Sequence, residues 1–127
     1  MNSSIRMLVL DDNVDVAESL GEILELSGYA VTLAHDGMTA IDLYCRGDID
    51  VGLFDVKMPG VNGVDALLAI KARVPEAAIL LMSGYADDGL IAKGLESGAI
   101  GLLSKPFEAD DMLSAIARIK KPALASA

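Results

Sequence analysis

Five side chains with the chemistry of a reactive site stand directly after short apolar runs of the sequence. They are, in chain order, Asp11, Asp12, Asp55, Ser83 and Lys105. An open parallel sheet gathers the carboxyl ends of its strands along one rim, where ligands bind. We therefore expect three acids, one hydroxyl and one amine to face a single crevice.

Three carboxylates in one crevice repel one another. At ~4 Å separation and an effective dielectric constant of about 20, each pair of like charges costs about 4 kcal/mol. The cluster must therefore bind a cation or hold a proton, because the single amine of Lys105 cannot balance three acids. A hard divalent ion, Mg²⁺, fits ligands that offer only oxygen.

Of the three acids, Asp55 is the candidate nucleophile towards a phosphoryl group. A carboxylate can form an aspartyl-phosphate, and a metal ion cancels the repulsion between the two anions. Asp55 stands alone before the turn Met58-Pro59-Gly60, whereas the adjacent Asp11 and Asp12 look like a ligand pair. Ser83 and Lys105 would supply a hydroxyl and a fixed positive charge to the transferring oxygens.

The elements that must position these residues alternate along the chain, as in stacked βαβ units. Strands are predicted at 5–10, 29–34, 51–54, 78–82 and 100–104, and helices at about 14–26, 37–46, 64–73, 87–96 and 108–120. We predict a single domain over 1–127, with a body at about 5–120 and a frayed tail at 121–127. The helix at 87–96 is predicted to be the least stable, because Gly89 and Gly94 each cost ~1 kcal/mol relative to alanine.

Composition and charge exclude several classes of protein. The 127 residues carry 19 acidic and 10 basic side chains, a net charge of -9, which argues against direct binding to nucleic acid. No apolar stretch approaches the ~20 residues that cross a bilayer, and no signal peptide is evident, so we expect a cytoplasmic protein without membrane attachment. Cys45 is predicted to be a buried helical thiol and His35 to lie in a surface turn.

Taken together, four motifs resemble the receiver domain of two-component response regulators, from Ile5 to about Lys120. The motifs are Val9-Leu10-Asp11-Asp12-Asn13, Phe54-Asp55-Val56-Lys57-Met58-Pro59-Gly60, Met82-Ser83-Gly84-Tyr85 and Gly101-Leu102-Leu103-Ser104-Lys105-Pro106-Phe107. The resemblance implies an α/β fold, a doubly wound five-stranded parallel sheet of order 2-1-3-4-5, flavodoxin-like (βα)5. It implies either a standalone receiver or one cut from a longer regulator.

The resemblance also implies a role for each site residue. Asp55 would accept a phosphoryl group from a phosphohistidine of a sensor histidine kinase or a phosphotransfer protein. Asp12, Asp55 and the backbone carbonyl of Lys57 would hold Mg²⁺, with Asp11 acting largely through water. Ser83 and Lys105 would contact the phosphoryl oxygens, and the Lys105-Pro106 peptide would be cis.

Signal output is where this sequence departs from the family, because Leu102 occupies the position of the usual aromatic switch residue. We expect output to use the face formed by the helix at 87–96, the strand at 100–104 and the helix at 108–120, where a downstream protein or output domain would dock. Phosphorylation-dependent dimerisation stays open. Tyr85 would either cover the phosphoryl group or be an ordinary surface aromatic.

Such a receiver is not a turnover enzyme, although it catalyses its own phosphorylation and dephosphorylation. A rival interpretation is a phosphohydrolase resembling the haloacid dehalogenases, but its second acid would fall at Asn13. A flavodoxin is a second rival, and Asp11-Asp12-Asn13 would repel the phosphate of its cofactor. A receiver that no longer takes phosphate is disfavoured, since all five site residues are present in type.

Overall fold

The computed structural model describes residues 4–84 and 88–125, which form five strands alternating with five helices. The strands are β1 (Arg6–Leu10), β2 (Ala30–Ala34), β3 (Val51–Asp55), β4 (Ala78–Ser83) and β5 (Gly101–Ser104). The helices are α1 (Val14–Leu26), α2 (Gly37–Cys45), α3 (Gly63–Arg73), α4 (Asp88–Glu96) and α5 (Ala109–Ala125).

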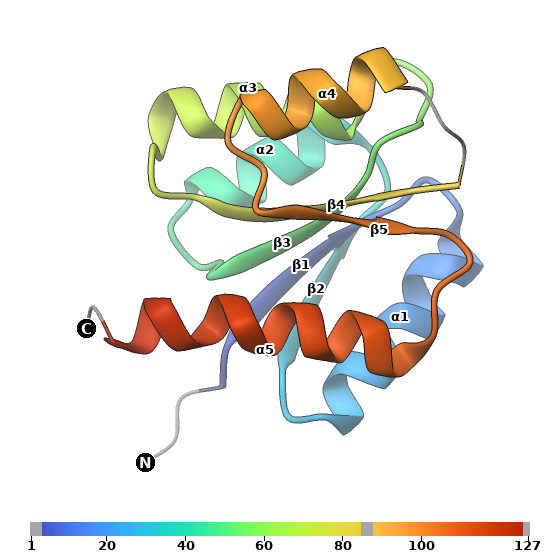
Figure 1. Ribbon diagram of the computed structural model, residues 1–127, viewed down its shortest axis with the longest axis vertical. Coiled ribbons are helices and arrows are strands. Elements are labelled where there is room, and N and C mark those ends of the chain that lie inside the picture. Colours follow the sequence, from blue (N-terminus) through green and yellow to red (C-terminus); the bar gives the residue numbers. More distant parts are fainter. Residues whose placement is uncertain (1–3, 85–87, 126–127) are drawn as a thin grey trace.

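All strand pairs are parallel and the sheet order is β2-β1-β3-β4-β5, which confirms the predicted doubly wound α/β fold. Helices α2, α3 and α4 cover one face of the sheet, and α1 and α5 cover the other (Figure 1). Successive strand residues point to opposite faces. In β1, Leu8 and Leu10 join the core under α2–α4, while Met7 and Val9 join the core under α1 and α5.

Side-chain caps fix the beginning of the helices that follow β1, β2 and β3. Asn13, Asp36 and Asn62 are extended in backbone and accept hydrogen bonds from N–H groups of the first turn of α1, α2 and α3. Asn62 and Asp65 form a reciprocal capping box. Because each capped helix begins just after the carboxyl end of a strand, the caps also fix the loops at that edge.

Most predicted boundaries agree with the structure to within one residue, and one is wrong. The last helix was predicted to end near Lys120, whereas α5 continues to Ala125. Pro122 removes one backbone donor, yet the lysines before it and the alanines and leucine that follow it in the helix all have high helix propensity, which favours continuation of the helix. Cys45 ends α2 and is only partly buried, against the core under α2–α4.

Gly94 has a packing role that its helix propensity alone does not reveal. It is buried, and a Cβ atom there would lie 2.6 Å from Leu81 Cδ1 and 3.1 Å from Val64 Cγ2. The glycine therefore lets α4 approach β4 and α3 closely. Gly89, by contrast, faces open space.

None of the helices in the described part of the chain combines the length and the apolar character that a bilayer crossing requires.

Candidate functional site

The carboxyl edge of the sheet brings the predicted site residues together. Asp11 directly follows β1, Asp55 ends β3, Ser83 ends β4 and Lys105 directly follows β5. Among the described residues, the polar side chains classed as buried are Asp11, Asp55 and Ser83, with exposed fractions of 1%, 6% and 5%. Burying polar groups is costly, so their concentration at one edge marks this edge as the candidate site.

Lys105 connects the acidic side chains. Its Nζ donates to Asp11 Oδ2 at 2.9 Å and lies 3.7 Å from Asp55 Oδ1. The other oxygen of Asp11, Oδ1, accepts the backbone N–H of Asn13 at 2.9 Å. The backbone N–H of Lys105 donates to the carbonyl of Ser83 at 2.7 Å, which joins the ends of β4 and β5. The nearest partner of the ammonium is thus Asp11 rather than Asp55.

The acidic cluster has the chemistry of a divalent metal site. Asp11, Asp12 and Asp55 each place a carboxylate oxygen within 4.8 Å of the others, and Asp12 is the exposed member. Two oxygens bound to one Mg²⁺ lie at most about 4.2 Å apart, twice the bond length of about 2.1 Å. A small closing movement would therefore let these oxygens share an ion.

Burial raises the pKa of Asp55 from 3.8 to about 6. The Lys105 ammonium and the backbone N–H of Lys57, which bonds to the Asp55 carboxylate, act in the opposite direction, while the charges of Asp11 and Asp12 raise the pKa further. Loss of solvent outweighs the attraction to one lysine because the acid is nearly inaccessible. At neutral pH the side chain is a carboxylate held in unfavourable surroundings, ready to bind a positive ion.

This raised pKa predicts a stability change with pH in metal-free protein. Between pH 4 and 6 the folded state binds more protons at Asp55 than the unfolded state does, so the free energy of unfolding falls as pH rises through this window. A pKa raised from 3.8 to about 6 corresponds to about 3 kcal/mol over the whole titration, of which about 2 kcal/mol falls between pH 4.5 and 7.5. Urea unfolding in EDTA at pH 4.5 and 7.5 measures this difference in the free energy of unfolding. Asp55→Asn should lack the part of the difference that comes from Asp55. Equal pH dependence in both proteins would contradict the assignment.

Gly63 is a site residue that the sequence analysis did not single out. It is the first residue of α3, and a Cβ atom there would lie 2.2 Å from the carbonyl oxygen of Asp55 and 2.8 Å from its carbonyl carbon. The α3 backbone therefore packs directly on the main chain of the candidate nucleophile. A glycine directly after a helix-capping asparagine was the available signal.

The remaining predicted residues lie around this centre. Leu102 is a partly buried residue of β5 that packs against the core under α2–α4. The Lys105–Pro106 peptide bond is cis, and Lys57 is exposed. His35 is exposed, as the surface-turn interpretation requires, and its Nδ1 donates to the backbone carbonyl of Asp11 at 3.1 Å. Tyr85 lies outside the described residues.

Comparison with known proteins agrees with this fold. Residues 7–117 match the family model of the response regulator receiver domain. Response regulator MprA of Mycobacterium bovis is 34% identical over 122 residues, which cover 94% of this chain and 53% of MprA. The transcriptional regulatory protein FixJ of Bradyrhizobium diazoefficiens is 34% identical over 116 residues, which cover 91% of this chain and 56% of FixJ. The chain therefore spans about half the length of these curated relatives.

Solved structures give the same result. A CheY-like receiver domain protein from Methanospirillum hungatei JF-1 superposes with a TM-score of 0.93 at 26% identity, covering 98% of this chain and all of that one. A receiver domain protein from Clostridium thermocellum gives a TM-score of 0.88 at 29% identity, covering 95% and 98% of the two chains. Because the family model matches residues 7–117 of its 127 residues, this chain belongs to the receiver domains of two-component response regulators.

Proposed function

We propose that Asp55 accepts a phosphoryl group from a phosphohistidine of a sensor histidine kinase or phosphotransfer protein, in a reaction that requires Mg²⁺. The observation that carries the proposal is the position of Asp55: nearly buried, beside Lys105 and within one acidic cluster with Asp11 and Asp12. A cytoplasmic location and autocatalytic dephosphorylation belong to the same proposal.

The residues present suit an in-line transfer to Asp55. A carboxylate oxygen of Asp55 forms the new P–O bond as the P–N bond of the phosphohistidine breaks, and the electron pair of that bond goes to the imidazole nitrogen. When bound, Mg²⁺ offsets the repulsion between the carboxylate and the phosphoryl oxygens. Lys105 Nζ, 3.7 Å from Asp55 Oδ1, is placed to bind a phosphoryl oxygen, with the Ser83 hydroxyl as a second donor.

The proposed ligand set is the one that the family resemblance implies, and the acidic cluster of Asp11, Asp12 and Asp55 supports it. Asp12 and Asp55, with the backbone carbonyl of Lys57, would bind the ion directly. Asp11 already accepts hydrogen bonds on both oxygens, from Lys105 and from Asn13. This suits an indirect role for Asp11, through water and through the position of Lys105.

Incubation with a small phosphodonor such as acetyl phosphate tests the proposal directly. With Mg²⁺ the intact protein should gain the mass of one phosphoryl group, stable in acid and lost in alkali as an acyl phosphate is. With EDTA in place of Mg²⁺ the gain should disappear, because ionised Asp55 would then repel the donor. No mass gain in the presence of Mg²⁺ would defeat the proposal.

Docking of the phosphodonor protein has a candidate surface beside the site. A pocket of about 410 Å³ lies between α1 and the segment after β5. Val16 and Leu20 line it from α1, and Lys105 and Phe107 line it from the other side. An apolar surface that adjoins the phosphoryl-binding lysine suits a partner that must present its phosphohistidine to Asp55.

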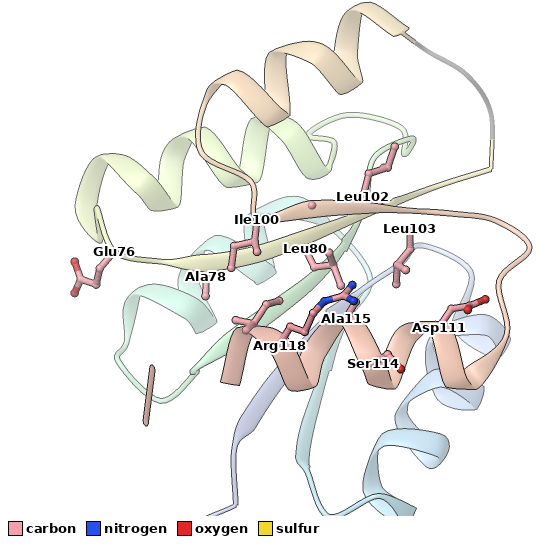
Figure 2. Close-up of a pocket in the computed structure, with 12 residues that line it drawn as sticks. Glu76, Ala78, Leu80, Ile100, Leu102, Leu103, Asp111, Ser114, Ala115 and Arg118 are labelled. Atoms are coloured by element: carbon pink, nitrogen blue, oxygen red, sulfur yellow. The ribbon is translucent and has the colours of Figure 1, made fainter. Parts of the chain in front are cut away.

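Output is proposed to use the face formed by α4, β5 and α5, where a downstream protein or an output domain would bind. A groove of about 710 Å³ runs beside β5, between β4 and α5. Figure 2 shows Asp111, Ser114 and Arg118 on its α5 side and Ile100 at the start of its β5 side. Ile100 and Leu95 of α4 are 47% and 43% exposed, so this face offers apolar surface to a partner.

Helix α4 is the element we expect to respond to phosphorylation. Among its residues whose side chains are described, only Gly94 is buried, so few apolar contacts oppose a shift. Hydrogen exchange with and without Mg²⁺ and beryllofluoride, a phosphoryl mimic, should show altered protection of Leu90 to Glu96. Unchanged protection there would exclude α4 from the response.

Dimerisation is a separate question. A change in molar mass on addition of the phosphoryl mimic would reveal it.

A further inference from the structure

The turn His35-Asp36-Gly37, between β2 and α2, takes no part in the proposed chemistry but contacts the site on one side. The backbone N–H of Asp11 donates to the carbonyl of Ala34 at 3.1 Å. The Nδ1–H of His35 donates to the carbonyl of Asp11 at 3.1 Å. Both backbone polar groups of Asp11 are therefore held by the end of β2 and the turn that follows it.

The other side of the turn supports the loop between β3 and α3. Gly37 is buried, and a Cβ atom there would lie 2.4 Å from the carbonyl oxygen of Val61 and 2.5 Å from Val61 Cγ1. Only a glycine lets the first residue of α2 approach the loop this closely. Asp36 caps α2 beside this contact, because its carboxylate accepts the Thr39 N–H at 2.8 Å and the Thr39 hydroxyl at 2.9 Å.

That loop carries Lys57, whose carbonyl is the proposed backbone ligand of Mg²⁺. At the far end of the loop, Gly63 packs on the carbonyl of Asp55. The loop is therefore held between two glycine contacts, one on the nucleophile and one on α2. A displacement at Val61 changes the path of the chain that leads back to Lys57.

We propose that the turn His35-Asp36-Gly37 positions the metal site, by holding the backbone of Asp11 through His35 and the Lys57 loop through the contact of Gly37 with Val61. The proposal rests on the function assigned above to Asp55 and its neighbours. Residues that orient metal ligands without touching the metal typically change affinity by about 10–100-fold when substituted. Gly37 and His35 are accordingly positioning residues.

Calorimetric titration of Mg²⁺ into metal-free protein tests the proposal. Gly37→Ala should raise the Kd for Mg²⁺ roughly tenfold, with a changed chemical shift of the Lys57 amide in the ¹⁵N–¹H spectrum. Phosphorylation from acetyl phosphate at saturating Mg²⁺ should retain most of the wild-type rate, because Asp55, Lys105 and Ser83 are intact. His35→Ala should weaken Mg²⁺ binding in the same direction, and His35→Asn should restore it, because the asparagine amide can donate from the place of Nδ1.

Tyr44→Phe is the matched control for loss of stability alone. Its hydroxyl accepts the N–H of Ala78 at 3.0 Å and lies 3.4 Å from the carbonyl of Asp50, at the opposite ends of β3 and β4 from the site. The Tyr44→Phe variant should have a lower free energy of unfolding and an unchanged Kd for Mg²⁺. If Gly37→Ala does not fold, the Kd values for Mg²⁺ of His35→Ala and His35→Asn test the proposal.

Two results would overturn the inference while leaving the proposed function intact. One is wild-type Mg²⁺ affinity in folded Gly37→Ala and His35→Ala, and the other is an equal loss of affinity in Tyr44→Phe. Failure of the wild-type protein to bind Mg²⁺ or to take a phosphoryl group would remove the proposed function and this inference with it.

Discussion

Asp55→Asn is expected to abolish phosphoryl incorporation from acetyl phosphate. Asparagine has nearly the same shape, but its amide is not a nucleophile towards phosphorus and it removes one of the three charges that would attract Mg²⁺. Asp55 is 6% exposed at the end of β3, whereas Asp11 already accepts hydrogen bonds on both oxygens and Asp12 is exposed, so neither neighbour is placed as Asp55 is. Intact-protein mass spectrometry after incubation with Mg²⁺ measures the effect.

Asp15→Asn is the matched control for this variant. It removes the same charge from an exposed residue in the first turn of α1, outside the cluster, and should be phosphorylated like the parent. Circular dichroism should show that Asp55→Asn is folded. In metal-free buffer at neutral pH it should be more stable than the parent, because burial raises the pKa of Asp55 to about 6 and makes its ionised form costly. A phosphorylated Asp55→Asn protein would move the acceptor to another residue.

Gly63→Ala is expected to cause the largest loss of stability among single-methyl substitutions at this site. The added Cβ would lie 2.2 Å from the carbonyl oxygen of Asp55, and the obstacle is backbone rather than a mobile side-chain end. Overpacking of this kind costs roughly 1–3 kcal/mol, occasionally more. We expect a net loss of about 2–3 kcal/mol in urea unfolding, with slower phosphorylation because Asp55 must shift.

Gly89→Ala separates this clash from the intrinsic effect of exchanging glycine for alanine. Gly89 also lies in the first turn of a helix, but nothing stands within 4 Å of its Cβ position. This variant should be as stable as the parent or more stable by up to ~1 kcal/mol. Similar free energies of unfolding for the two variants would show that the close approach at Gly63 is easily relieved.

The order of the elements and the fold class could be predicted because they depend on local pattern. Alternation of apolar runs with amphipathic segments defines βαβ units, and the handedness of crossovers leaves few topologies. The end of α5 was not placed correctly, because Pro122 is an expected helix breaker, whereas the helix continues past it to Ala125.

Chemistry at the strand ends was predictable for the same reason. Parallel strands share an edge for their carboxyl ends, so the residue types after each apolar run are enough to propose an acidic, phosphoryl-accepting crevice. The different surroundings of Asp11 and Asp12 did not follow from residue type, although the family resemblance had already given Asp12 a direct and Asp11 an indirect place at the metal. The two acids are neighbours in the chain, yet Asp11 is 1% exposed and bonded to Lys105, while Asp12 is exposed.

The sequence by itself therefore determined which elements form, the family and the set of residues at one edge of the sheet. Only the tertiary structure decided the pairing of Lys105 with Asp11 across 94 residues of chain, the raised pKa of Asp55 and the contacts of Gly37 and Gly63 with the β3–α3 loop. The physical reason is that periodicity assigns a side chain to a face. Desolvation, ion-pair distance and close backbone approach depend on atoms supplied by distant segments once the chain has packed.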